Sequence, residues 1–248
     1  MVRDVNIAPI RSVGRAIDII EAFVNVGDHL SIEKIMEETK LPKATVYRLL
    51  YTLELRGLIQ YDEQKQTYSL GLKFLTYGHI IDKGNEILNV AKPILEDLQQ
   101  KVNQTVMMAV PDGEKMVYVY SKENEHGLKF STEKGRRRPI TYGVVGKVFM
   151  SYMDQQRIEQ LLGVKKYEQF QPARARILAD GYYIEYEETN PGVNGIGTGI
   201  IDRNDNCLAV IAVVGPSILF NEDQLHKGVQ QLLLARNEIA LKLNVILN

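Results

Sequence analysis

Residues 31–61, SIEKIMEETKLPKATVYRLLYTLELRGLIQY, decide the fold of the N-terminal part of the chain. Ser31 is a typical N-cap, and the polar residues after it fit the first turn of a short helix. Lys40-Leu41-Pro42 ends this helix, because proline restricts the residue before it and cannot continue a helical ladder. A second helix is predicted from Lys43 to about Arg56, followed by a glycine and a strand-like run. This order of elements is typical of modules that bind DNA.

The second predicted helix has one apolar and one polar face. Its inner face is formed by residues that recur at helical spacing: Val46, Leu49, Leu50 and Leu53. Its outer face carries cationic, hydroxyl and aromatic side chains with one small residue: Lys43, Ala44, Thr45, Tyr47, Arg48 and Tyr51. Such groups suit phosphates and base edges in a major groove. A solvated face is the alternative, but two exposed tyrosines favour a contact surface.

A further helix is predicted before this pair, with Ser12 as its N-cap and Gly27 as its stop. Its apolar residues fall on one face at helical spacing: Val13, Ala16, Ile17, Ile20, Phe23 and Val24. After the pair, residues 58–61 and 67–70 are predicted strands of a β-hairpin wing. Lys65 at its tip could contact a phosphate, or the hairpin could serve only to close the small core.

The overall charge does not by itself indicate a nucleic-acid partner. The formal net charge is −1, and residues 1–80 contain ten Lys and Arg against ten Asp and Glu. Any DNA contact therefore depends on where the charges lie. Arg3, Arg11 and Arg15 precede or begin the first predicted helix. They are candidates for an arm that reaches the DNA backbone or minor groove, or for ordinary surface charge.

Length and composition indicate one large or two ordinary domains. The chain has 248 residues, of which 45% are apolar. No apolar run approaches the roughly 20 residues of a membrane span, and the first residues lack the apolar core of a signal peptide. The single cysteine, Cys207, permits no internal disulfide, so we expect a cytoplasmic protein without a membrane partner.

The pattern changes after the wing. Leu72, Leu75, Ile80 and Ile81 predict a linker helix that ends near Gly84. Beyond it we predict helices over 87–102, 143–163, 175–181 and 222–247, and strands over 105–110, 116–120, 128–131, 196–201 and 207–214. Mixed helices and strands in this order fit an α/β or α+β sensor domain better than a second DNA-binding module.

Several motifs are weak alone but specific in combination and order. They are RSVGRA (11–16), LPKATVYRLLYTL (41–53), GLI (57–59), GVVGK (143–147), NPGV (190–193) and VGP (214–216). With these motifs the chain resembles the IclR family of bacterial transcription regulators over nearly its whole length. The resemblance implies an α+β protein with a winged helix-turn-helix domain (1–71), a linker helix (72–84) and a GAF-like α/β effector-binding and oligomerisation domain (85–248). It also implies homodimers or homotetramers on double-stranded operator DNA.

The resemblance further implies where a small-molecule effector binds. Carried over by motif, the positions are Val144, Val145, Glu185, Gly195, Ala212 and Val214. Members that bind small acids have serines where this chain has Ala212 and Val214, and often a cysteine at Gly195. We therefore expect a roomier, more apolar pocket and an effector larger or less polar than glyoxylate or pyruvate.

An organic-acid effector would need groups that hold its carboxylate. The backbone amides near Val145, at the start of a predicted helix, could do so, although the glycines there could equally serve close packing. Arg138 could assist, but the run Arg136–Arg138 could also be a solvated loop or a subunit contact. Glu185 would instead favour a hydroxyl or an amine on the effector.

No pattern in the sequence indicates catalysis, a metal site or a cofactor. The four histidines lack ligand-like spacing, and neither a nucleophile elbow nor a phosphate-binding loop is found. The glycines of residues 192–199 do not follow the dinucleotide-binding register. We expect a ligand-responsive DNA-binding regulator, and the resemblance makes a repressor of a small metabolic operon the commoner case. The alternatives are a small-molecule enzyme with a fused winged-helix adaptor and a protein-interaction adaptor.

Overall fold

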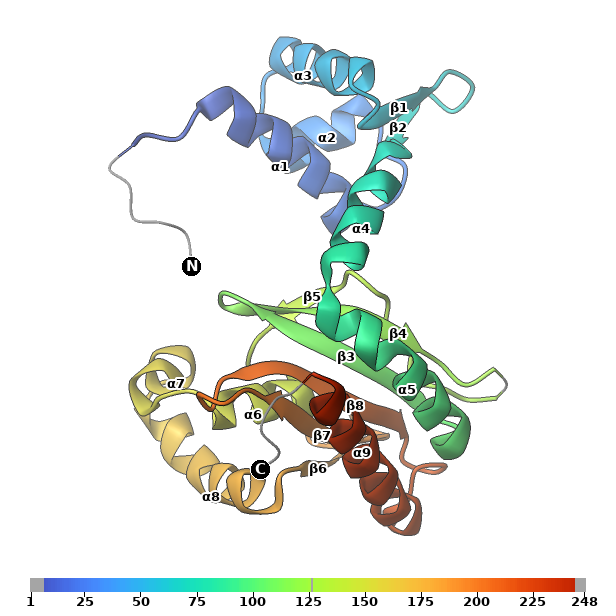
Figure 1. Ribbon diagram of the computed structural model, residues 1–248. Helices are drawn as coiled ribbons and strands as arrows, with labels where there is room; N and C mark the ends of the chain where they lie inside the picture. The colour runs from blue at the N-terminus through green and yellow to red at the C-terminus, as the bar shows by residue number, and fades with distance from the viewer. Residues whose placement is uncertain (1–6, 126, 244–248) are drawn as a thin grey trace. The chain divides into compact units, whose positions relative to one another are not determined.

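The computed structural model describes residues 7–125 and 127–243 (Figure 1). The chain separates into two compact units, Met1–Gly84 and Asn85–Asn248. Arg3, predicted as part of a DNA-contacting arm, lies outside the described residues. Each unit has its own core, and each is therefore described by itself.

The N-terminal unit is a helix-turn-helix with a β-hairpin wing, as predicted. Its elements are α1 (Arg11–Val26), α2 (Ile32–Thr39), α3 (Lys43–Leu55), β1 (Ile59–Asp62), β2 (Thr67–Leu70) and α4 (Lys73–Gly84). The Ser31 hydroxyl caps α2 by accepting a hydrogen bond from the Lys34 amide at 3.3 Å. Lys40 then takes a left-handed conformation (φ 56°), and this residue ends α2 just before the proline.

The core of this unit joins all three of its first helices to the wing. Ile19 and Phe23 of α1 pack with Ile35 of α2 and with Val46 and Leu50 of α3. The predicted apolar face of α1 needs a correction, because the three-helix core covers only part of it. Of the predicted face, Val13, Ile17 and Val24 are left exposed.

The C-terminal unit is built on a six-stranded antiparallel sheet with the strand order β5-β4-β3-β8-β7-β6. The strands are β3 (Thr105–Asp112), β4 (Lys115–Lys122), β5 (Arg137–Pro139), β6 (Tyr183–Tyr186), β7 (Val193–Ile201) and β8 (Cys207–Pro216). The helices are α5 (Glu86–Val102), α6 (Gly143–Ser151), α7 (Gln155–Leu162), α8 (Val164–Asp180) and α9 (Glu222–Lys242). Together with the winged unit this gives the α+β fold that was predicted.

The two faces of the sheet support separate cores (Figure 1). Side chains of α5 and α9, such as Leu95 and Leu232, pack with Met108 and Ile211 on one face. Val145 and other side chains of α6 pack on the opposite face. Alternate residues along each strand point to opposite faces, so the side chains beside α6 form a set distinct from those beside α5 and α9.

Four sequence predictions for this unit differ from the structure. Residues 128–131 do not form a strand, and the predicted helix 143–163 is two helices, because Asp154 caps a new helix at the Arg157 amide. Helix α8 is much longer than the predicted 175–181 and passes through Pro172. The short edge strands β5 and β6 were not predicted, since three or four residues show too little periodicity.

Candidate functional sites

The outer face of α3 is open to solvent. Lys43, Ala44, Tyr47, Arg48 and Tyr51 are exposed on this helix, and Thr45 is half-buried. Tyr51 keeps 63% of its accessible surface and Tyr47 keeps 48%. The Lys43 ammonium lies 5.8 Å from the centroid of the Tyr47 ring. The face therefore presents cations and flat rings in a form that a DNA groove can accept.

A groove runs between the beginning of α1 and the outer face of α3. It is lined by Arg11, Ser12, Arg15, Thr45, Arg48, Leu49, Tyr51 and Thr52. None of its three arginines forms an ion pair within residues 7–125 and 127–243. The first turn of α1 contains no acidic residue and has no side-chain cap. Helix-end amides and unpaired guanidinium groups together make this groove suitable for phosphate oxygens.

Lys65 lies in the wing turn, but its charge is partly compensated. Its ammonium is 3.7 Å from the Asp62 carboxylate. Asp62 Oδ1 also accepts hydrogen bonds from the Lys65 and Gln64 amides at 3.1 and 3.0 Å. The hydrogen bond from the Lys65 amide is the main reason that the pKa of Asp62 lies below its usual value. Lys65 is thus a weaker candidate for a phosphate contact than the unpaired arginines of the groove.

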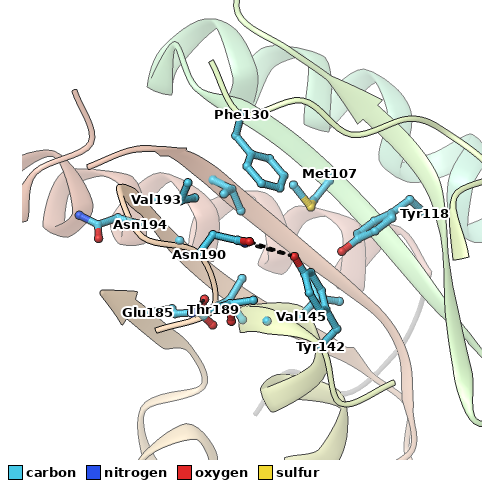
Figure 2. A pocket seen from close by; sticks show the side chains of 14 residues that line it. Met107, Tyr118, Phe130, Tyr142, Val145, Glu185, Thr189, Asn190, Val193 and Asn194 are labelled. Atoms are coloured by element: carbon cyan, nitrogen blue, oxygen red, sulfur yellow. Dashed lines mark hydrogen bonds between the residues drawn. The ribbon is translucent and has the colours of Figure 1, made fainter. Parts of the chain in front are cut away.

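The C-terminal unit contains a pocket on the α6 side of its sheet (Figure 2). The pocket has about 360 Å³ of empty space, part of it open to solvent. It is lined by Met107, Tyr118, Phe130, Tyr142, Gly143, Val144, Val145, Glu185, Thr189, Asn190, Val193, Asn194, Gly195 and Val214. The volume enclosed within this space is only about 30 Å³, below the range of small-molecule sites, so this structure does not show the roomier pocket that was expected.

Glycines bring α6 close to the sheet and to the loop before it. A Cβ added at Gly195 would lie 3.2 Å from Cγ1 of Val144, and one at Gly146 would lie 2.7 Å from the Ile140 carbonyl oxygen. Close packing therefore requires these glycines. Gly143 has a φ of +65° and begins the helix, whose N-cap, Tyr142, provides no side-chain cap. The first-turn amides of α6 thus border the pocket without an intrahelical partner.

One buried carboxylate, that of Glu185, also lines the pocket. Glu185 Oε1 accepts a hydrogen bond from the Thr189 amide at 3.2 Å, and Oε2 lies 3.4 Å from the Lys147 ammonium. Lys147 also contacts Glu188 at 2.6 Å and lies 4.9 Å from the centroid of the Tyr183 ring. The charge of Glu185 is therefore compensated inside the unit.

A second polar pair lies across the mouth of the pocket (Figure 2). The Asn190 amide donates to the Tyr142 hydroxyl at 3.1 Å, and this bond joins the β6–β7 connection to the start of α6. Arg138 stacks on the Tyr142 ring, with its guanidinium carbon 4.9 Å from the ring centroid. Arg138 is not among the residues that line the pocket, and its predicted contact with the effector stays a prediction.

Comparisons with known proteins follow the same division. Residues 12–63 match the IclR helix-turn-helix domain, and residues 80–241 match the C-terminal domain of bacterial transcriptional regulators of the IclR type. The chain belongs to the IclR family. It is a transcription regulator, and the alternative of an enzyme finds no support in its relatives.

Curated relatives in the IclR family are similar over most of their length. HTH-type transcriptional regulator KipR of Bacillus subtilis is 27% identical over 207 residues, which cover 79% of this chain and 82% of the relative. HTH-type transcriptional regulator XynR of Escherichia coli is 27% identical over 215 residues, covering 82% and 85%. Both names describe regulators, in agreement with the fold and the open face of α3.

Solved IclR structures share the fold at low sequence identity. An IclR regulator from Alicyclobacillus acidocaldarius superposes with a TM-score of 0.84 at 17% identity, covering 94% of this chain and 99% of that one. An IclR homologue from Microbacterium hydrocarbonoxydans in complex with 4-hydroxybenzoate has a TM-score of 0.80 at 18% identity, covering 94% and 99%. These likenesses concern the fold alone.

For this IclR chain, the structure brings most of the predicted effector positions together. Val144, Val145, Glu185, Gly195 and Val214 all line the pocket. Ala212 is fully buried in the sheet core and is not among the lining residues. The predicted contact roles of all these residues stay predictions.

Several lining residues were not predicted, and most come from the neighbouring strands and loops. They are Met107, Tyr118, Phe130, Tyr142, Gly143, Thr189, Asn190, Val193 and Asn194. The predicted strands 105–110 and 116–120 contained the first two, but the sequence did not indicate which face each side chain takes. Thr189 directly precedes the NPGV motif, and Asn190 and Val193 belong to it, so that motif was the available signal for them.

Across residues 7–125 and 127–243, no helix has both the length and the apolar composition that a membrane crossing requires. Within the same residues, His, Cys, Asp and Glu side chains do not gather in threes in a way that could bind a metal ion.

Proposed function

We propose that this protein is a ligand-responsive repressor of a small metabolic operon, and that it acts in the cytoplasm on double-stranded operator DNA. The observation that carries the DNA-binding part is the open face of α3 with three arginines that form no ion pair with other described residues. Helix α3 enters a major groove, where Arg48 and Thr45 contact bases or phosphates. Lys43, Ala44, Tyr47 and Tyr51 complete the contact face.

Contacts from the groove between α1 and α3 position α3 on the DNA backbone. Arg11 and Arg15 contact phosphates, because guanidinium groups form charge-assisted bonds with phosphate oxygens. Lys65 in the wing adds a weaker contact, since Asp62 partly neutralises it. Phosphate contacts of this kind fix the register and supply affinity without reading the sequence.

The protein acts as a homodimer, or as a homotetramer made of two dimers. This proposal rests on apolar side chains of the N-terminal unit that its own core leaves exposed. On α1 they are Val13, Ile17 and Val24, and on and before α4 they are Leu72, Leu75, Ile80 and Ile81. Exposed apolar surface of this extent marks an interaction site. A two-fold dimer would place two recognition helices about one DNA turn, or a multiple of one, apart.

The effector is a small organic acid that binds in the pocket beside α6. Its carboxylate is held by the first-turn amides of that helix, where the helix dipole also favours an anion. Val144, Val145, Gly195 and Val214 form the surrounding wall. The IclR homologue that was solved in complex with 4-hydroxybenzoate, a compact organic acid, supports this class of effector. An effector that binds one arrangement of the dimer more tightly would shift operator binding.

Selection of genomic fragments by the purified full-length protein tests the DNA-binding part. Bound fragments are sequenced at two salt concentrations, with light scattering to give the oligomeric state. We expect enrichment of one palindromic element, and neighbouring genes that encode metabolism of an organic acid. Uniform weak recovery at both salt concentrations, with and without candidate acids, would contradict the proposal.

A further inference from the structure

Tyr118 places a free hydroxyl inside the pocket. The residue lies on β4 and keeps only 5% of its accessible surface. Figure 2 shows its hydroxyl pointing from the strand toward the pocket interior, on the side of Tyr142. Among the described residues, no hydrogen bond to this hydroxyl is found. The hydroxyl is not among the side-chain oxygens that are sealed from solvent, so it is open to the pocket and available to a bound molecule.

A β-bulge is what turns Tyr118 toward the pocket. Met108 of β3 pairs with Tyr120, but the next residue, Ala109, pairs with Tyr118, so β4 carries one extra residue at this point. The shift sends Tyr118 to the α6 face of the sheet and Tyr120 to the opposite face. Bulges are common next to functional sites, where they redirect a side chain.

The Tyr118 hydroxyl is a hydrogen-bond donor at every physiological pH. Burial is the main cause that raises the pKa of Tyr118 to about 12, and nearby Tyr142 adds to the shift. A phenol with a raised pKa keeps its proton far above neutral pH, so it can donate to an acceptor such as a carboxylate. The Tyr142 hydroxyl differs, because it is already paired with Asn190.

Glu185 lines the same pocket and provides a hydrogen-bond acceptor, whereas Tyr118 provides a donor. Its carboxylate is buried and has two partners among the described residues, the Thr189 amide and the Lys147 ammonium. An ionised carboxylate offers about four lone-pair sites and donates nothing. Glu185 can therefore accept a further hydrogen bond from a ligand hydroxyl, but it would repel a second carboxylate.

We propose that Tyr118 determines the specificity of the pocket: its hydroxyl and the first-turn amides of α6 hold the carboxylate of a compact hydroxy acid whose own hydroxyl donates to Glu185. Tyr118 then supplies a hydroxyl to a pocket in which β8 contributes an apolar valine, Val214. Met107, Phe130 and Val193 cover the apolar body of the acid. This inference rests on the proposed function of the pocket as an effector site.

Calorimetric titration of the full-length protein tests the ligand class. The probes are three hydroxy acids, each with its partner lacking the hydroxyl: 4-hydroxybenzoate with benzoate, mandelate with phenylacetate, and lactate with propionate. We expect at least one hydroxy acid to bind, and to bind more tightly than its partner. Absence of binding by all three hydroxy acids, or equal affinity within every pair, would overturn the proposal.

The variant Tyr118→Phe tests the donor, and Tyr120→Phe is its matched control. Tyr120 is a buried tyrosine two residues along the same strand whose hydroxyl also lacks a partner, but it faces the other core. We expect Tyr118→Phe to lower the affinity for the hydroxy acid about 10- to 100-fold, as for loss of a hydrogen bond to a charged group. Tyr120→Phe should change this affinity less than about 2-fold. Equal affinity of Tyr118→Phe and the wild type would overturn the assignment.

The variant Glu185→Gln tests the other end of the pocket. It should reduce the preference for the hydroxy acid over its partner, because an amide is a weaker acceptor than a carboxylate. An unchanged preference would overturn the role of Glu185. Operator binding without acid, measured on the control Tyr120→Phe, should stay at the wild-type level. If wild-type protein binds a hydroxy acid through Tyr118 but selects no DNA, the regulator proposal fails and the pocket assignment stands.

Discussion

The two candidate sites differ most in how they treat charge. In the groove between α1 and α3, three arginines lie at the surface without an ion pair among the described residues. In the pocket, the one carboxylate is buried and compensated by Lys147. Surface charges in water depend on salt, whereas buried pairs are screened much less. DNA affinity should therefore depend on ionic strength. The stability of the pocket should depend instead on single partners such as Lys147.

The largest effect is expected from breaking the buried pair of the pocket. Lys147→Met would leave the Glu185 carboxylate buried with only the Thr189 amide as partner. Removing one member of a buried pair costs about 3 kcal/mol of unfolding free energy. Urea unfolding of the full-length protein, followed by circular dichroism, measures this loss in the C-terminal unit.

Two further variants separate the charge effect from a packing effect. Lys92→Met makes the same substitution at an exposed site of α5 and should change stability by less than about 0.5 kcal/mol. The double variant Lys147→Met/Glu185→Gln should recover most of the loss, because the uncompensated charge is then absent. A single variant as stable as the wild type would show that Glu185 does not need Lys147.

Close packing at the start of α6 gives the next largest effect. In Gly146→Ala the new Cβ would lie 2.7 Å from the Ile140 carbonyl oxygen, a backbone atom that cannot move aside cheaply. We expect a loss of about 2 kcal/mol in the same unfolding experiment. Gly14→Ala in α1 is the matched control, since no atom lies within 4 Å of its added Cβ. That variant should be neutral or stabilised, and equal losses in both would contradict the packing argument.

Specific DNA affinity should fall when the central arginine of α3 is removed. Arg48→Ala is expected to cost about 1–3 kcal/mol on the selected operator if the side chain contacts a base. Fluorescence anisotropy on the operator and on an unrelated duplex measures the affinity and the specificity. Arg48→Lys keeps the charge but loses the two-pronged geometry, so it should recover only part of the affinity.

Removal of a charge elsewhere controls for the Arg48 experiment. Lys92→Ala takes one positive charge from an exposed site of α5 and should leave operator affinity unchanged. If Arg48→Ala lowers the affinity for the operator and for the unrelated duplex equally, Arg48 contacts a phosphate instead of a base. If it lowers neither affinity, α3 does not enter the DNA, and the protein-interaction alternative regains support.

The same contrast explains which parts of the molecule the sequence could predict. The helix-turn-helix depends on local signals: Ser31 caps α2, Lys40 ends it, and the spacing of Val46 and Leu50 sets the inner face of α3. Its outer face follows directly, because the side chains of one helix have a fixed periodicity. The exposed apolar residues of α1 were harder to place, since only the packed unit shows where its core ends.

The pocket draws on β3, β4, α6, β6, β7 and β8, so no local pattern could predict it in full. Motifs located Val144, Val145 and Glu185, but the strand pairing placed Tyr118. Strict alternation would put Tyr118 and Tyr120 on the same face of the sheet, and the bulge in β4 separates them. Arg138 was predicted from its charge alone, and in the structure it stacks on the Tyr142 ring outside the lining residues.

The smallest expected effect distinguishes phosphate binding from base reading within the arginine groove. Arg15 is not on the recognition helix α3. It lies on α1 and lines the groove between α1 and α3. Arg15→Ala should therefore weaken the operator and an unrelated duplex by the same factor, about 1 kcal/mol at low salt. The slope of log K against log salt concentration is negative, and each lost phosphate contact reduces its magnitude by about 0.9.

Anisotropy titrations at four or more salt concentrations measure that slope for the wild type, Arg15→Ala and Lys92→Ala. The slope of Lys92→Ala should match the wild type, because exposed Lys92 lies on α5 in the other unit. An unchanged slope for Arg15→Ala would assign Arg15 to ordinary surface charge. A loss confined to the operator would instead give α1 a part in sequence recognition, through an arm that reaches base edges in the minor groove. Only an equal loss on both duplexes together with a reduced slope supports the phosphate contact.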